Sequence, residues 1–140
     1  MKVSTKVRTK LSKKNKYYIS NDRRLELEHF CRQYPEWRKA YISLENYGLK
    51  SPIMSEIHTD DISDPTARVA TLRVYYAERM KMVEDAANDA EPNIAKYILK
   101  AVTENLSYPE IKARLDIPCG KDMFYDRCRK FYWILSGKRK

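Results

Sequence analysis

The stretch SYPEIKARLDIPCGKDMFYDRCRKFYWILS, residues 107–136, predicts two helices joined by a tight turn. Ser107 can cap a short first helix, because its hydroxyl can accept a hydrogen bond from the free backbone N–H groups of the first turn. Pro109 suits that first turn, and Gly120 stands where a longer helix would begin. A short helix, a tight turn and a longer helix are typical of the helix-turn-helix motif.

The apolar residues of this stretch fall at the spacing that the motif requires. In the longer helix they recur at steps of four, three and four residues, which keeps them on one face. A simpler alternative to a helix-turn-helix is that the longer helix is the terminal helix of a small bundle and has no binding role. The positions predicted to face inward are Ile111, Leu115, Ile117, Phe124, Cys128, Phe131 and Leu135.

The polar residues around this apolar face form a candidate DNA-binding surface. Lys121 or Arg129 can hydrogen-bond guanine or neutralise phosphate, and Tyr125 can contact phosphate or a thymine methyl group. Asp122 and Asp126 would repel phosphate unless they accept a hydrogen bond from cytosine N4 or orient an arginine. The candidate site residues are Ser107, Tyr108, Lys121, Asp122, Tyr125, Asp126, Arg127, Arg129 and Lys130.

The composition of the 140-residue chain favours helices over a turn-rich β fold, with only three glycines and six prolines. We therefore expect an all-α protein, a small helical bundle with a C-terminal helix-turn-helix. The net charge is +9, and it is concentrated at the ends: residues 1–16 hold seven basic residues and no acid, and residues 91–140 hold eleven basic residues against six acids. Basic ends attract nucleic acid, although a basic tail can also be a plain solvated segment.

The pattern along the chain predicts four segments. The first segment lacks apolar periodicity, and the third carries serine, threonine, proline and acids in place of a clean period. The segments are a disordered basic tail over 1–16, a helical hairpin over 17–48, a linker over 49–63, and a long helix with the helix-turn-helix DNA-binding region over 64–140.

Local signals predict where the helices begin and end. Ser20 is a good N-cap for the first helix, Pro35 suits the first turn of the second, and Gly48 fits its end. A long helix is expected to start at Pro65. Its apolar stripe over 65–88 can pack in a core or pair with a second copy as a dimer seam. The stripe consists of Val69, Leu72, Tyr76, Met80, Val83 and Ala87.

The second half of the last helix is apolar on all sides, because residues 131–135 read FYWIL. Such a segment must be covered from more than one direction. Trp133 is the surplus residue, and the 65–88 helix or a homodimer partner is predicted to bury it.

Several classes of function are not expected. The sequence has no apolar run long enough for a membrane helix, and no secretory signal, so a cytoplasmic location is the simplest interpretation. Three cysteines without paired spacing predict no metal site, and Cys128 is expected in the core. Nucleotide-binding and hydrolase motifs are missing, so we expect neither an enzyme nor a cofactor.

Three pieces of the chain carry a resemblance: KAVTENLSYPEIKARLDIPC (100–119), FYDRCRKFYWILS (124–136) and YPEW (34–37). Over roughly residues 17–138 the chain resembles late-gene transcription regulators of the ArpU/RinA type, from phages and prophages of Gram-positive bacteria. Their helix-turn-helix is similar to the one in region 4 of sigma factors. The resemblance implies DNA binding through Lys121 to Lys130 and regulation of phage transcription. Members often have serine just before the last helix, where this chain has Gly120.

These observations predict a sequence-specific regulator of phage or prophage genes that reads the major groove of double-stranded DNA with its last helix. One alternative is a sigma-like adaptor that docks on host RNA polymerase through Trp133 and the Tyr76–Met80 stripe. Another is a small-terminase-like DNA-packaging protein, which would form a ring.

Overall fold

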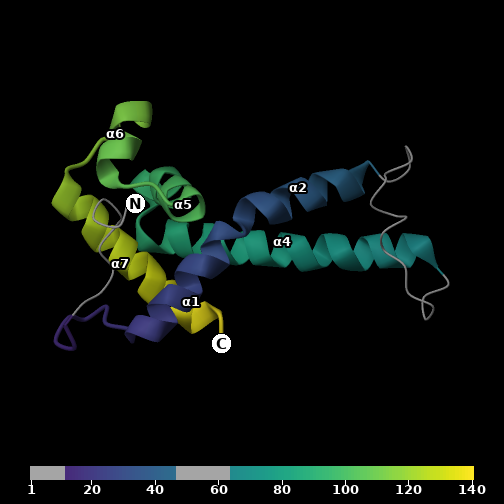
Figure 1. The fold of residues 1–140 in the computed structure, drawn as a ribbon, viewed down its shortest axis with the longest axis horizontal. Coiled ribbons are helices and arrows are strands. Elements are labelled where there is room, and N and C mark those ends of the chain that lie inside the picture. Colours follow the sequence, from purple (N-terminus) through teal and green to yellow (C-terminus); the bar gives the residue numbers. More distant parts are fainter. Residues whose placement is uncertain (1–11, 47–63) are drawn as a thin grey trace. The chain divides into compact units, whose positions relative to one another are not determined.

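The computed structural model describes residues 12–46 and 64–140, and every regular element in these ranges is helical (Figure 1). The prediction of an all-α protein is confirmed. The predicted tail, as far as residue 11, the stop at Gly48 and the linker over 49–63 lie outside the described residues. The elements are α1 (Asn21–Arg32), α2 (Tyr34–Glu45), α4 (Pro65–Ala90), the 3-10 turn η2 (Pro92–Ile94), α5 (Ala95–Glu104), α6 (Tyr108–Leu115) and α7 (Lys121–Lys138).

The predicted helix starts are confirmed. The Ser20 hydroxyl accepts a hydrogen bond from the backbone N–H of Arg23 at 3.3 Å, as an N-cap does. Pro35 lies in the first turn of α2, and Pro65 is the first residue of α4. Proline fits these positions because the first turn of a helix does not need its N–H.

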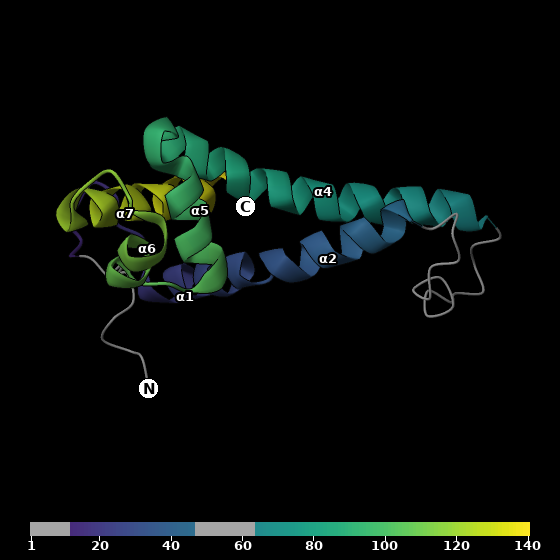
Figure 2. The same cartoon turned by 90° about the horizontal axis from the view of Figure 1, so that it is seen from above.

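The described chain divides into two compact units. Unit 1 contains residues 12–33 and 82–140, and unit 2 contains residues 34–81. The predicted hairpin over 17–48 is divided between them, because the buried face of α1 packs on α5 and α7. In Figures 1 and 2, α5, α6 and α7 lie together within unit 1.

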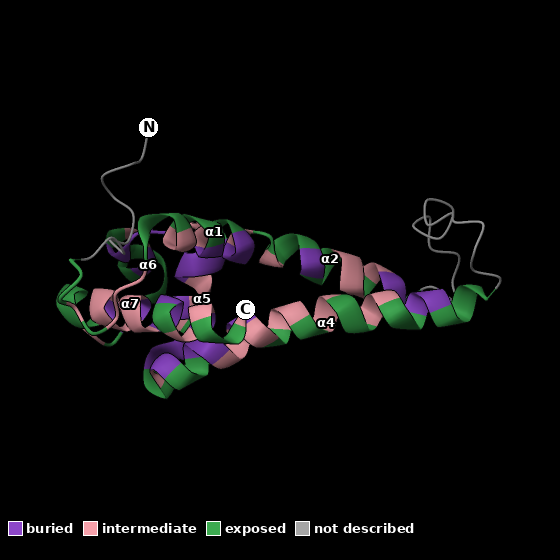
Figure 3. Cartoon of the chain, turned by 90° about the horizontal axis from the view of Figure 1, so that it is seen from below, coloured by how far each residue is buried: buried purple, intermediate pink, exposed green. Residues whose placement is uncertain are grey.

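The core of unit 1 is built mainly from α1, α5, α6 and α7, whose buried faces are purple in Figure 3. The side chains that are 0% exposed include Leu27, Cys31, Ile98, Ile111, Phe124, Cys128, Phe131 and Leu135. The inward positions predicted for the last helix are therefore confirmed, and so is Cys128 as a core residue. Ile117, in the turn before α7, is also buried at 4% exposure.

Two packing predictions are wrong. Leu115 is 40% exposed, because α6 ends at this residue and the backbone turns into the left-handed conformation at Asp116. Trp133 is 47% exposed in the single chain, so the cover predicted from the 65–88 helix is not seen, and burial by a homodimer partner stays a prediction. At about 100° per residue, Trp133 lies almost opposite Phe131 and Leu135, which occupy the side of α7 that faces the core.

Unit 2 has few buried side chains, chiefly Trp37, Leu44 and Val69. The Arg73 guanidinium donates a hydrogen bond to the Tyr41 hydroxyl at 3.2 Å and lies 5.1 Å from the centre of its ring, which links α4 to α2. Of the stripe predicted on the long helix, Val69, Val83 and Ala87 are buried, whereas Leu72, Tyr76 and Met80 are only half-buried.

No helix in the described ranges combines the length and the apolar character that a membrane span requires.

Candidate nucleic-acid interface

The first turn of α6 is fixed by a capping box between Ser107 and Glu110. The backbone N–H of Ser107 donates to Glu110 Oε1 at 3.0 Å, and the Ser107 hydroxyl accepts from the backbone N–H of Glu110 at 3.4 Å. These bonds satisfy N–H groups that a helix start otherwise leaves unpaired. Ser107, one of the predicted site residues, is only 2% exposed, so its side chain shapes the helix start.

Tyr108, another predicted site residue, connects α6 to the turn and to α7. Its hydroxyl donates a hydrogen bond to the backbone carbonyl of Cys119 at 2.7 Å, and its backbone N–H donates to the Tyr125 hydroxyl at 3.3 Å. Its ring contacts the rings of Phe124 and Tyr125. Tyr108 is 8% exposed, and its contacts hold the turn and the start of α7 against α6.

The turn between α6 and α7 is short. Asp116 adopts a left-handed conformation with φ of 51°, and its N–H donates to the carbonyl of Lys112 at 3.2 Å, closing α6. Gly120 is extended, with φ of −80° and ψ of 171°, and no side chain caps α7. The end of α6 and the start of α7 are therefore fixed relative to each other by backbone geometry and by Tyr108.

The first turns of α7 present the other predicted site residues in two groups. Lys121 and Asp122 are exposed, and Tyr125, Asp126, Arg129 and Lys130 are half-buried. At about 100° per residue, Asp122, Asp126 and Arg129 lie on one side of the helix, opposite Phe124 and Phe131. Tyr125 flanks this side on one edge and Lys130 on the other, so five of the predicted residues share one accessible face. Lys121 lies near the direction of the buried Cys128 and is exposed as the first residue of α7.

The carboxylate of Asp126 is neutralised by arginines. It is paired with Arg127, and one of its oxygens lies 4.0 Å from Arg129 Nη2. Arg127 also forms an ion pair with Glu91, whose Oε1 lies 3.2 Å from the Arg127 Nε. This ion pair links the start of η2 to α7. Asp126 is thus less repulsive to phosphate than an isolated carboxylate would be, whereas Arg127 is occupied within unit 1.

The residues that the sequence analysis did not select include Lys112 and Arg114, both exposed on α6. The spacing of YPEIKARL contains a signal only for Lys112, which lies about 100° around the helix from the buried Ile111, whereas Arg114 lies about 60° from it. The structure also places the Tyr17 ring against Trp133, with ring centres 5.8 Å apart. No local pattern predicts that contact, because it joins segments more than a hundred residues apart.

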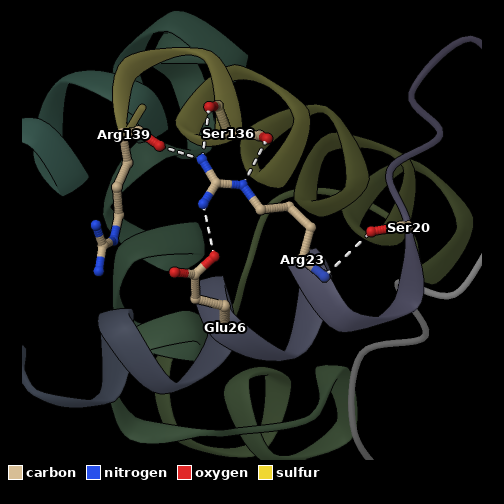
Figure 4. A network of polar contacts seen from close by, with 5 residues as sticks. All are labelled: Ser20, Arg23, Glu26, Ser136 and Arg139. Carbon is tan, nitrogen blue, oxygen red and sulfur yellow. Dashed lines mark hydrogen bonds and ion pairs between the residues drawn. The ribbon is translucent and has the colours of Figure 1, made fainter.

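A polar network anchors the start of α1 to the end of α7 (Figure 4). The Arg23 guanidinium donates to the Ser136 hydroxyl at 3.0 Å, to the Ser136 carbonyl at 2.9 Å, and to the carbonyl of Arg139. It also donates to Glu26 at 2.6 Å, which holds the pKa of that carboxyl below its usual value. Because this network joins the start of α1 to the end of α7, the residues just before α1 lie near the C-terminal half of α7.

Two of the three cysteines, Cys31 and Cys128, are buried, and Cys119 is partly buried. Burial raises the pKa of the Cys31 and Cys128 thiols well above the usual range, so both stay protonated. Cys119 is partly buried in the turn, and burial and Glu91 also raise its pKa. Within residues 12–46 and 64–140 no group of three or more histidine, cysteine or acidic side chains is placed to hold a metal ion.

Comparison with known proteins returned no match, whether to a protein-family model, to a curated protein or to a solved structure.

Proposed function

We propose that the protein is a sequence-specific DNA-binding regulator of phage or prophage transcription, in which α6, the turn and α7 act as a helix-turn-helix. The observation that carries this proposal is the α6–turn–α7 geometry. A short capped helix and a longer helix contact each other, and Tyr108 fixes the turn between them. In helix-turn-helix proteins the second helix enters the major groove with its N-terminal residues against the bases.

The accessible face of α7 suits this role. Lys121 is exposed at the first position of α7, where it can reach phosphate or the guanine edge. Arg129 lies two turns further along the same helix, half-buried, with its Nη2 4.0 Å from an Asp126 carboxylate oxygen. Phosphate contacts from such residues supply affinity, and contacts to base edges supply specificity.

The proposed role in phage or prophage transcription is supported by the sequence resemblance and not by the geometry. The resemblance to late-gene regulators of the ArpU/RinA type implies that the DNA target is a phage or prophage promoter region. Geometry alone supports only the binding of double-stranded DNA.

The test is duplex binding by fluorescence anisotropy, using fragmented phage DNA to select a target and then a labelled duplex of that sequence. Lys121→Ala with Arg129→Ala should weaken binding at least tenfold, because each base contact contributes about 1–3 kcal/mol. Lys96→Ala is a matched control, since Lys96 is an exposed lysine at the start of α5. Unchanged affinity and sequence preference in the double variant, with an intact fold by circular dichroism, would remove α7 from the reading role.

A second candidate, a sigma-like adaptor that binds RNA polymerase, is favoured by the exposed apolar side chains of unit 2. Ile42 is 47% exposed, Val74 54% and Tyr75 45%. Exposed apolar groups within one small unit suit a protein contact. Co-purification with host RNA polymerase in the absence of DNA, and its loss in Ile42→Asp with Val74→Asp, would support the adaptor over the direct DNA reader.

A further inference from the structure

The segment before α1 is seated on the C-terminal half of α7. Tyr17 packs its ring against Trp133 at 5.8 Å, and Tyr18 and Ile19 line a groove of about 500 Å³ with Trp133 and Ile134. Two turn hydrogen bonds, from Asn15 N–H to the Ser12 carbonyl and from Tyr18 N–H to the Asn15 carbonyl, are each 3.1 Å long. Residues 12–20 are therefore a folded segment with a defined path along α7.

This segment carries basic side chains that are directed to solvent. Lys13, Lys14 and Lys16 are exposed, and no carboxylate in the described parts of the chain pairs with them. Lys16 lies 5.1 Å from the centre of the Tyr17 ring, the same ring that packs on Trp133. The aromatic contact thus fixes the position of a positively charged group.

Trp133, the residue on which Tyr17 packs and which we call the seat, lies on the same side of α7 as the proposed reading face. At about 100° and 1.5 Å per residue, Trp133 is only about 40° around the helix from Arg129 and about 6 Å further along its axis. A duplex that contacts Asp126 and Arg129 would pass close to the segment that Trp133 holds.

We infer that residues 12–20 form a DNA-contacting arm, seated on Trp133 by Tyr17, in which Lys13, Lys14 and Lys16 bind the duplex phosphates that flank the site read by α7. This inference rests on the proposed function and adds a second, sequence-independent contact to it. The contact is ionic, so it should release counterions on binding and contribute to the salt dependence of affinity.

The test measures duplex affinity at a series of salt concentrations for the full chain and two pairs of substitutions. Lys13→Gln with Lys14→Gln should lower the slope of log K against log salt by about 2, since each phosphate contact contributes about 0.9. Affinity at 0.1 M salt should fall at least tenfold, roughly as counterion release predicts. Arg38→Gln with Lys39→Gln removes an equal charge from adjacent exposed residues of unit 2 and should change neither quantity.

The seat is tested by Trp133 itself. Trp133→Ala should weaken duplex binding, Trp133→Phe should retain most of it, and Trp133→Ala should add little further loss to the Lys13→Gln, Lys14→Gln variant. If the lysine pair binds with wild-type affinity and slope while Lys121→Ala with Arg129→Ala still weakens binding, the arm is overturned and the proposed function stands. If the wild-type chain binds no duplex at low salt, the proposed function fails, and the phosphate role of the arm fails with it.

A readout without DNA tests the seat independently. The chain has two tryptophans, so Trp37→Phe leaves Trp133 as the only fluorescent indole. In that background Tyr17→Ala should shift the emission to longer wavelength and increase quenching by acrylamide, whereas Tyr75→Ala in unit 2 should not. Unchanged emission in Tyr17→Ala would overturn the seat even if the protein binds DNA.

Discussion

At the scale of single residues, Arg23 joins α1 to the end of α7 through three hydrogen bonds. Its planar guanidinium serves two carbonyls and a hydroxyl near the end of α7, as well as Glu26 in its own helix. A lysine cannot reproduce this set, because its ammonium lacks the fixed fork of donors.

Arg23→Ala should lower the free energy of unfolding by about 1–3 kcal/mol, since hydrogen bonds from charged groups have this magnitude and the carbonyls lose their donor. Urea unfolding followed by circular dichroism measures the change. Arg23→Lys should restore less than half of the loss. Arg38→Ala, at an exposed position of α2, should stay within about 0.5 kcal/mol of the wild type. A loss in Arg38→Ala as large as in Arg23→Ala would show that the network in Figure 4 contributes nothing specific.

The buried thiols make stability depend on alkaline pH. Burial raises the pKa of Cys31 and Cys128 in the folded state, so the unfolded state releases these protons first, near its ordinary pKa of about 8.5. The stabilisation is therefore fully present at neutral pH and is lost as pH rises above that value. Each thiol can contribute a slope of up to about 1.4 kcal/mol per pH unit. Cys31→Ala with Cys128→Ala should flatten the fall in unfolding free energy between about pH 8.5 and pH 10; an equally steep fall would contradict this origin.

At the scale of elements, the start of α7 lacks a side-chain acceptor for its free backbone N–H groups. Gly120 has an extended conformation that any residue adopts, and a Cβ built there meets nothing within 4 Å. A serine hydroxyl could accept from the free N–H groups of the first turn.

Gly120→Ser should raise the free energy of unfolding by about 0.5–1 kcal/mol, because it adds a cap and reduces the freedom of the unfolded chain. Thermal unfolding measures the shift. Gly120→Ala separates the two causes, since it shares the reduced freedom but offers no acceptor. A serine variant no more stable than the alanine variant would mean that the cap contributes nothing.

At the capping box of α6 a substitution should lower the free energy of unfolding, the opposite of the change expected at Gly120. Ser107→Ala should destabilise the protein by about 1 kcal/mol, because it removes the acceptor that Glu110 N–H uses. Urea unfolding checks the size, and Ser20→Ala, at an exposed cap with one bond, should have a smaller effect. If Ser107→Ala weakened DNA binding without any loss of stability, Ser107 would be a contact residue, as the sequence suggested.

The elements that could be predicted from sequence are those whose signal is local. Helix periodicity placed Phe124, Cys128 and Phe131 correctly in the core, and the caps at Ser20 and Ser107 followed from residue type alone. The position of α1 on α5 and α7 could not be predicted, since it depends on contacts between distant segments. For the same reason the contact between Tyr17 and Trp133 could not be predicted.

At the scale of the whole molecule, the two units differ in how much they bury. Most of the fully buried side chains belong to unit 1, whereas unit 2 depends on a few residues such as Trp37 and Leu44. Amide hydrogen exchange should therefore be slower in α5 and α7 than in α2, because local opening requires less energy where fewer apolar contacts are lost. Mass spectrometry of peptic fragments measures this difference. Equal protection in both units would indicate that they unfold together.

The discontinuity of unit 1 in sequence has a consequence for variation among such chains. Residues 34–81 leave unit 1 after α1 and return to it within α4, so for unit 1 they are an insertion. The entropy of closing a loop grows only slowly with length, by about 0.6 kcal/mol for each doubling. Unit 2 can therefore be lengthened or exchanged for another module while the surface that α7 presents stays intact, which would let one scaffold acquire different partners.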